Sequence, residues 1–124
     1  MENKQIVQAL WQAIDRQNWQ QLQAFFALQA VICWHNTNEQ FTPPEFVRAN
    51  SEYPGKWRIT VQRLEETQTG VVSVVHVTDS IQSFHATSFF SFENGIITRL
   101  DEYWGDDGDA PQWRKTKKIG KPIQ

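Results

Sequence analysis

The chain has 124 residues, of which 40% are hydrophobic and 13% aromatic, and its formal net charge at pH 7 is −2. This length suits one domain that buries about two-thirds of the surface of its unfolded chain. The weak negative charge gives no general attraction to nucleic acid or anionic lipid, and no stretch approaches the ~20 apolar residues of a membrane span. Because Cys33 is the only cysteine and no signal peptide is visible, we expect a cytoplasmic protein without disulfides.

The first third of the chain has the pattern of two short helices followed by a strand. Residues 5–15 place apolar side chains at helical spacing. A second helix is predicted from residue 19 to about residue 28, with Asn18 as its N-cap and Gln21 as the capping-box partner. Residues 30–36 then have the composition of a strand. Two helices so close in sequence form a hairpin that can cover one face of a sheet.

A third helix is predicted after a polar loop, because several start signals agree. Thr42 is the expected N-cap, Pro43 takes the first helical position and Glu45 completes a capping box. The helix should end near Ser51, ahead of a Pro-Gly turn.

The second half of the chain predicts four antiparallel strands, at residues 57–66, 71–78, 84–92 and 96–104. A loop and a basic tail follow at residues 106–124. Helices are thus segregated from strands, which is typical of the α+β class. We expect a cone in which three helices of the N-terminal half pack on a strongly curved, antiparallel or mixed sheet.

The register of the last two strands decides which of two adjacent acids faces inward, because a slip of one residue exchanges the faces of a strand. A two-residue Asn-Gly loop pairs Phe92 with Ile97 and turns Asp101 inward, whereas a three-residue loop pairs Phe92 with Ile96 and turns Glu102 inward. We prefer the three-residue loop, because it separates apolar from polar side chains more cleanly.

Four features together resemble the SnoaL-like branch of the nuclear transport factor 2-like superfamily. They are the helix hairpin, its break at Asp15-Arg16-Gln17-Asn18-Trp19, the strand–helix–strand middle, and the closing Phe-x-Phe-x-x-Gly-x-Ile-x-x-Leu-x-x-Tyr-Trp stretch. The resemblance covers nearly all of residues 1–124 and implies a single cone-shaped domain that forms a homodimer through its sheet. It specifies function poorly, because the superfamily includes isomerases, dehydratases, cyclases, epoxide hydrolases and non-catalytic binding modules.

The catalytic sets of two branches of that superfamily are absent or incomplete in this chain. Trp34, Leu10 and Ser88 stand where ketosteroid-isomerase-like members carry a base, a tyrosine and a second acid, and none of the three can do that chemistry. Glu102 stands where limonene-epoxide-hydrolase-like members carry an aspartate, but the Arg-x-Asp pair that those enzymes need does not occur in residues 71–79.

Glu102 is therefore the one catalytic candidate. Among apolar neighbours its pKa should rise, and the group could then act as a general acid or base near neutral pH. The structural alternative is a carboxylate that pairs with an arginine such as Arg58 or Arg63, or that reaches water at the mouth of the cone.

The histidines, Cys33 and the acidic loop do not supply a complete set of metal ligands. His76 and His85 should face each other across two strands, and Cys33 and His35 share a face of one strand, but a zinc site needs about three or four protein ligands. The acidic loop at residues 106–109 lacks the ligand spacing of a calcium loop. We expect no metal, no cofactor and no nucleic-acid partner.

These observations predict a pocket protein that binds a small, largely apolar ligand in the cone, with no assigned catalysis. The residues expected to contact the ligand are Trp34, Asn36, Trp57, Ser88, Phe90, Leu100 and Trp104, with Glu102 beside them. Two alternatives stay open. One is a cofactor-independent lyase, isomerase or hydrolase that uses Glu102, and the other is a dimeric interaction module whose cone is filled by its own side chains.

Overall fold

The computed structural model describes residues 1–124 and contains four helices and six strands. The helices are α1 (Asn3–Asp15), α2 (Trp19–Ala24), α3 (Pro43–Ser51) and α4 (Gln112–Thr116). The strands are β1 (Phe26–Trp34), β2 (Glu39–Phe41), β3 (Arg58–Glu66), β4 (Gly70–Thr78), β5 (Ser83–Glu93) and β6 (Ile96–Asp106).

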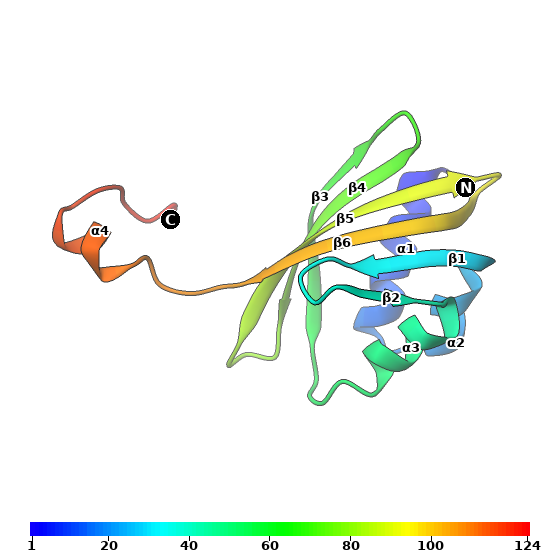
Figure 1. Cartoon of the computed structure of the whole chain (residues 1–124), viewed down its shortest axis with the longest axis horizontal. Helices are drawn as coiled ribbons and strands as arrows, with labels where there is room; N and C mark the ends of the chain where they lie inside the picture. Colours follow the sequence, from blue (N-terminus) through cyan, green and yellow to red (C-terminus); the bar gives the residue numbers. More distant parts are fainter.

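All six strands form one curved sheet in the order β2-β1-β6-β5-β4-β3. Every neighbouring pair is antiparallel except β1 and β6, which run parallel. The three N-terminal helices lie together against the sheet, whereas α4 and the residues after it project away from the body beyond the end of β6 (Figure 1). No helix is long and apolar enough to cross a bilayer. The predicted α+β architecture of three helices on a mixed, curved sheet is thus confirmed.

The second helix is shorter than predicted. Asn18 caps it as expected, since its side-chain oxygen accepts a hydrogen bond from the backbone N–H of Gln21 at 3.3 Å. The helix nevertheless ends at Ala24, and β1 begins at Phe26 instead of residue 30. The backbone carbonyl of Phe25 accepts a hydrogen bond from Ile97, so pairing with β6 takes the backbone groups that a longer helix would have used.

The signals at the start of α3 are all confirmed. The backbone N–H of Glu45 donates to the Thr42 hydroxyl at 3.3 Å, and the backbone N–H of Thr42 donates to the Glu45 carboxylate at 2.9 Å. The polar loop expected before this helix contains β2, which the sequence did not predict. This short strand pairs with the end of β1 and so extends the sheet beside α3.

The hairpin between β5 and β6 corrects the predicted loop but keeps the predicted inward acid. Asn94 and Gly95 both have positive φ and form a two-residue loop, so the three-residue loop is wrong. A bulge then skips Thr98, because Phe92 pairs with Ile97 while the preceding residue of β5 pairs with Arg99. The extra residue exchanges the faces of the rest of β6.

Because of this bulge, Glu102 faces inward opposite Ser88, and Asp101 faces outward. The two-residue loop, ahead of the bulge, pairs Ile97 with Phe92 and buries Ile97, whereas Ile96, which the three-residue loop would have turned inward, is exposed.

The core fills the space between α1 and the inner face of the sheet. Its fully buried members come from both layers and include Val7, Leu10, Ile32, Val75 and Leu100.

Two further contacts position the elements around this core. Asp15, the last residue of α1, accepts hydrogen bonds from the Arg58 side chain at 3.0 Å and from the backbone N–H of Ile59 at 2.9 Å, which ties α1 to β3. Gly70 lies so close to β5 that a Cβ atom there would be 1.7 Å from the carbonyl oxygen of Phe90.

Candidate functional site

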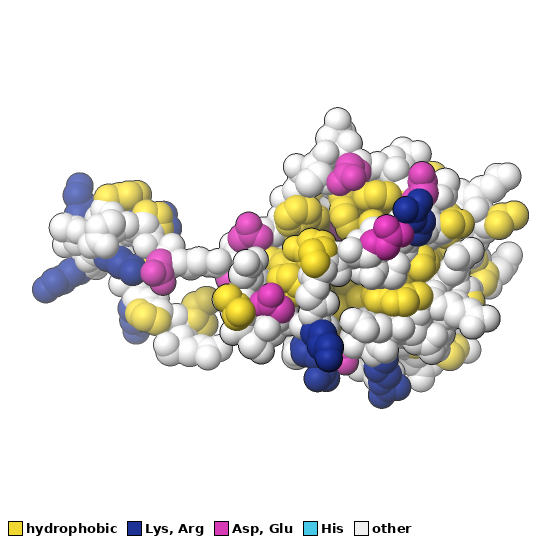
Figure 2. Space-filling model, turned by 90° about the horizontal axis from the view of Figure 1, so that it is seen from below, with side chains coloured by type: hydrophobic (Ala, Val, Ile, Leu, Met, Phe, Trp, Pro, Cys, Tyr) yellow, Lys and Arg dark blue, Asp and Glu magenta, His cyan; other side chains and the backbone are white.

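A cavity of about 350 Å³ lies between the helices and the inner face of the sheet. Its lining comes from α1, α2 and α3 on one side and from all six strands on the other. Eight of its side chains are aromatic: Trp11, Trp19, Trp34, Phe46, Tyr53, Trp57, Phe84 and Trp104. On the face shown in Figure 2, hydrophobic side chains gather over the body, with acidic and basic side chains around them. The cavity is therefore apolar in its walls and aromatic in character.

The aromatic walls hold one another in place. Trp34 packs edge-on against Trp104, with ring centroids 6.5 Å apart, and Trp104 contacts Phe84 at 6.2 Å. Phe84 in turn contacts Trp57 at 5.8 Å, and Tyr53 stacks on Trp57 at 5.4 Å. This continuous series of rings runs from β1 through the sheet to the segment between α3 and β3, so the wall is built from distant parts of the chain. Edge-to-face and offset contacts of this kind stabilise the rings beyond the burial of their surface.

Glu102 is the buried polar group of the cavity, with 5% of its surface exposed. One carboxyl oxygen accepts a hydrogen bond from the indole N–H of Trp34 at 3.0 Å, and the other accepts one from the Ser88 hydroxyl at 2.5 Å. Burial raises the pKa of Glu102 above its usual value, while the hydrogen bonds from Ser88 and Trp34 act in the opposite direction. The carboxyl group thus holds its proton to a higher pH than an exposed glutamate does.

No arginine neutralises Glu102, so the arginine pairing that the structural alternative offered is wrong. Arg58 pairs with Asp15 at 3.0 Å, and Arg63 pairs with Glu65 on its own strand. Glu102 is thus a buried acid whose two hydrogen-bond partners are both neutral side chains.

Four of the predicted site residues line the cavity together: Trp34, Trp57, Glu102 and Trp104. Ser88 is fully buried behind Glu102 and orients it. Phe90 and Leu100 were expected in the lining but belong to the core, because the inner face of β5 and β6 continues past the cavity and under α1, where Phe90 meets Trp11.

Asn36 also lies outside the cavity lining. Its side-chain oxygen accepts a hydrogen bond from the backbone N–H of Trp104 at 2.8 Å, and its side-chain nitrogen donates to the Trp104 carbonyl. The amide therefore continues the pairing of β1 with β6 after β1 has ended. This role fixes the backbone of Trp104 and engages one donor and the acceptor oxygen of the amide.

Several lining residues were not predicted from the sequence. Trp11 and Ile14 reach the cavity from the sheet-facing side of α1, and their spacing of three residues is the signal that could have placed them there. Tyr53 and Trp19 come from an irregular segment and a helix start, where side-chain direction does not follow from periodicity. Trp11 is also fixed by its indole N–H, which donates to the Ser73 hydroxyl at 3.0 Å.

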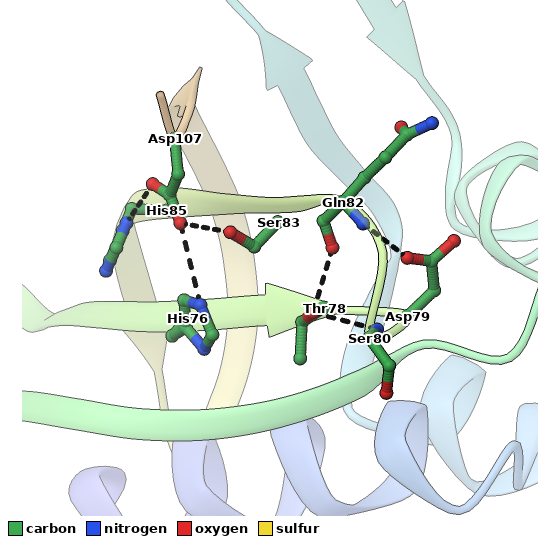
Figure 3. Close-up of polar contacts among 8 residues, drawn as sticks. All are labelled: His76, Thr78, Asp79, Ser80, Gln82, Ser83, His85 and Asp107. Atoms are coloured by element: carbon green, nitrogen blue, oxygen red, sulfur yellow. Dashed lines mark hydrogen bonds and ion pairs between the residues drawn. The ribbon is translucent and has the colours of Figure 1, made fainter. Parts of the chain in front are cut away.

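A second polar cluster lies where β4 and β5 meet the end of β6 (Figure 3). His76 and His85 pair across the strands as predicted, with ring centroids 5.1 Å apart. Asp107 lies 2.5 Å from His85 Nδ1 and 3.5 Å from His76 Nε2, and its other hydrogen bond comes from the Ser83 hydroxyl at 2.6 Å. That bond and the two histidines keep the pKa of Asp107 below its usual value. The cluster fastens the end of β6 to the neighbouring strands.

A third cluster brings together Cys33, His35 and Asp101 on the outer face of the sheet, close enough for one ion to reach all three. Asp101 lies 2.7 Å from His35, and the guanidinium of Arg99 donates to Asp101 at 2.8 Å and to Cys33 at 3.6 Å. Arg99 thus supplies the positive charge that an ion would otherwise bring. The arrangement is an ion-pair network rather than an open metal site.

No protein-family model matches the sequence, and no curated protein matches it. The fold has many counterparts among solved structures. A candidate ketosteroid isomerase from Kribbella flavida superimposes with a TM-score of 0.84 at 20% identity, covering 98% of this chain and 90% of that one. An NTF-2 like protein of unknown function from Burkholderia xenovorans gives 0.82 at 18% identity, covering 98% and 95%.

A third similar structure holds a small molecule. It is a hypothetical protein with a ketosteroid isomerase-like fold from Catenulispora acidiphila, in complex with trimethylamine, and it gives a TM-score of 0.66 at 15% identity over 79% of this chain and 83% of that one. The predicted fold is confirmed: the chain has the nuclear transport factor 2-like fold that ketosteroid-isomerase-like and SnoaL-like proteins share.

Proposed function

We propose that this chain, with its nuclear transport factor 2-like fold, binds a small, largely apolar molecule in the cavity between its helices and its sheet, and we assign it no reaction. The observation that carries this proposal is the aromatic-walled cavity of about 350 Å³ with one buried carboxyl group in its lining. Ligand sites in proteins are commonly apolar cavities of this size with a few polar groups that orient the ligand. A cavity of this volume also speaks against a cone that is filled by its own side chains.

A cavity-filling variant tests this proposal. Ala49 lies on α3 in the lining, so Ala49→Phe places a ring in the space that the ligand would occupy. Ala24 is exposed on α2, and Ala24→Phe adds the same ring outside the cavity as a matched control. Native mass spectrometry of the purified proteins should find a bound small molecule on the wild type and on Ala24→Phe and none on Ala49→Phe. Retention of the molecule by Ala49→Phe would place the site elsewhere.

A second candidate function is acid–base catalysis by Glu102. The raised pKa of this carboxyl group and its position in the cavity lining favour it, because a general acid or base works best when its pKa lies near the working pH. The neighbouring groups that bind it, Trp34 and Ser88, would orient it but cannot share the chemistry.

Small ketones and epoxides test the catalytic candidate. Deuterium exchange of the ketones and hydrolysis of the epoxides, both followed by NMR, should proceed with the wild type and stop with Glu102→Gln. Equal rates for the two proteins would exclude Glu102 as the catalytic group.

We also propose a homodimer through the outer face of the sheet. Phe89 and Tyr103 are 46% and 45% exposed there and contact each other edge-on at 6.0 Å, so two large apolar side chains meet water on neighbouring strands. Sedimentation of the wild type should give the mass of two chains, and Phe89→Glu should give one. Ile81→Glu, in the exposed turn between β4 and β5, is the control and should leave the dimer intact.

A further inference from the structure

The charged residues of the cavity lining all have the same sign. Of 21 lining residues, three carry carboxyl groups and none is lysine, arginine or histidine. Glu39 and Asp106 are exposed and stand at the mouth, whereas Glu102 is buried inside. A cavity with this charge distribution attracts cations and repels anions.

Building on the ligand-binding function proposed above, we propose that the ligand is a small organic cation, an alkylated amine or a quaternary ammonium compound. Five of the six tryptophans line the cavity, and tryptophan offers the best ring face for a cation. The lining thus combines the two features that recognise an alkylammonium group, aromatic faces and carboxylates.

The aromatic faces of the cavity are not occupied by the protein's own cations. The molecule has one cation–π contact, that of Arg114 on Trp113, which lies in the projecting C-terminal segment and outside the cavity. The tryptophans of the lining contact other aromatic rings and polar neutral groups instead. Four of the five, all but Trp11, are only partly buried, so part of their surface can contact a ligand.

Glu102 has no positively charged partner, so nothing in the folded chain balances the charge of its ionised form. Each of its oxygens accepts one hydrogen bond from a neutral donor, Trp34 or Ser88, and each keeps a further acceptor site. Arg58, which could have supplied a positive charge, is already paired with Asp15. A bound organic cation would supply the missing charge, and the hydrogen bonds from Trp34 and Ser88 already hold the carboxylate in place for it.

A metal ion does not fit this site as well as an organic cation. Glu39, Glu102 and Asp106 are not among the residues whose ligand atoms lie close enough together to share an ion. Metal ions of the calcium and magnesium type need six or more oxygen ligands at short distances. An organic cation, whose charge is spread over several atoms, can contact the ring faces and the Glu102 carboxylate at once and therefore suits the cavity better.

Pairs of ligands that differ only in charge test the proposal. Choline and 3,3-dimethyl-1-butanol have nearly the same shape, as do 3-hydroxyphenyl-trimethylammonium and 3-tert-butylphenol. Isothermal titration of the full chain should show the cation of each pair binding at least about tenfold more tightly than its neutral partner. In Glu102→Gln the cations should lose about tenfold in affinity, while the neutral compounds should change by less than about twofold. Trp113→Ala, which removes the tryptophan outside the cavity, should change neither.

The outcomes separate this inference from the proposed function. If the neutral member of each pair binds as tightly as the cation or more tightly, the inference is overturned and the ligand-binding function stands. If no probe binds although native mass spectrometry finds a bound molecule, the inference is again overturned alone. If no probe binds and no molecule is found, both fail.

Discussion

Replacement of Glu102 by glutamine isolates the effect of one buried carboxyl group without changing its shape. The glutamine oxygen can accept the Trp34 indole N–H as in the wild type, and the glutamine amide can donate to the Ser88 oxygen, which reverses the direction of that hydrogen bond but keeps the contact. What the variant loses is the ability to ionise.

The sign of the pH dependence follows from the raised pKa of Glu102 in the folded chain. In the unfolded chain a glutamate titrates near pH 4.3, so above that pH the unfolded state gives up its proton while the folded state still holds it. The contribution of Glu102 to the unfolding free energy is complete below the pKa of the unfolded state. It is lost as the pH rises through the pKa of the folded state. One proton corresponds to a slope of about 1.4 kcal/mol in unfolding free energy per pH unit.

Urea unfolding followed by far-ultraviolet circular dichroism measures this slope. Wild type and Glu102→Gln are compared in half-unit steps from pH 4 to pH 8, and the variant should become the more stable protein as the pH rises. Glu93→Gln, which removes an exposed charge from the same hairpin, corrects for the loss of one negative charge. Parallel pH dependences of the wild type and Glu102→Gln would refute the assignment of Glu102 as a buried carboxyl group with a raised pKa.

Three further predictions concern the frame around the cavity. Asp15→Asn should lower the unfolding free energy by about 1 kcal/mol at pH 7. Burial alone would raise the pKa of Asp15, but its hydrogen bonds lower it, so the contribution is present above the ordinary aspartate pKa of about 4 and is lost as the pH falls through the lowered pKa of the folded chain; a pH-independent deficit in urea unfolding would contradict this. Gly70→Ala should lower the unfolding free energy by about 3 kcal/mol, because its Cβ would meet the backbone of Phe90. The control Gly105→Ala, whose Cβ meets nothing within 4 Å, should lower it by less than about 0.5 kcal/mol. Equal midpoints of the two variants in thermal unfolding would exclude the close approach at Gly70. Removal of residues 112–124, all of them exposed, should shift the thermal midpoint by no more than about 2 °C, and a larger loss would show that this segment packs on the body.

Much of the fold could be predicted from the sequence where the determinants are local. The N-cap at Thr42 and the hairpin at Asn94-Gly95 rest on side chains within a few residues of the structure that they specify, and both were found. The failures come from contacts between distant segments. Residues 26–28 leave the helix because β1 pairs with β6 at Phe26 and again from Val31 onward, and β2 forms because the end of β1 is available.

In the candidate site, too, the predictions failed where the outcome depends on contacts between distant segments. The inward direction of Glu102 was predicted through a register that is wrong at the loop and is corrected by a bulge at Thr98, a feature with no distinct sequence signal. Asn36 was assigned to the ligand from its residue type, but a side chain just beyond a strand can also serve the backbone of its neighbour, as this one does for Trp104. The choice between these roles depends on distances that no sequence pattern supplies.

The distribution of the tryptophans has a practical consequence for anyone who handles this protein. Five of the six indole rings border the cavity where the ligand would lie, and the sixth, Trp113, belongs to α4 on the projecting segment. Entry of a guest should change the emission of the five, while Trp113, which is 58% exposed, contributes a constant background that Trp113→Phe would remove. The tryptophan fluorescence of the unlabelled chain should therefore report ligand binding, and libraries of compounds can be screened for binding in this way.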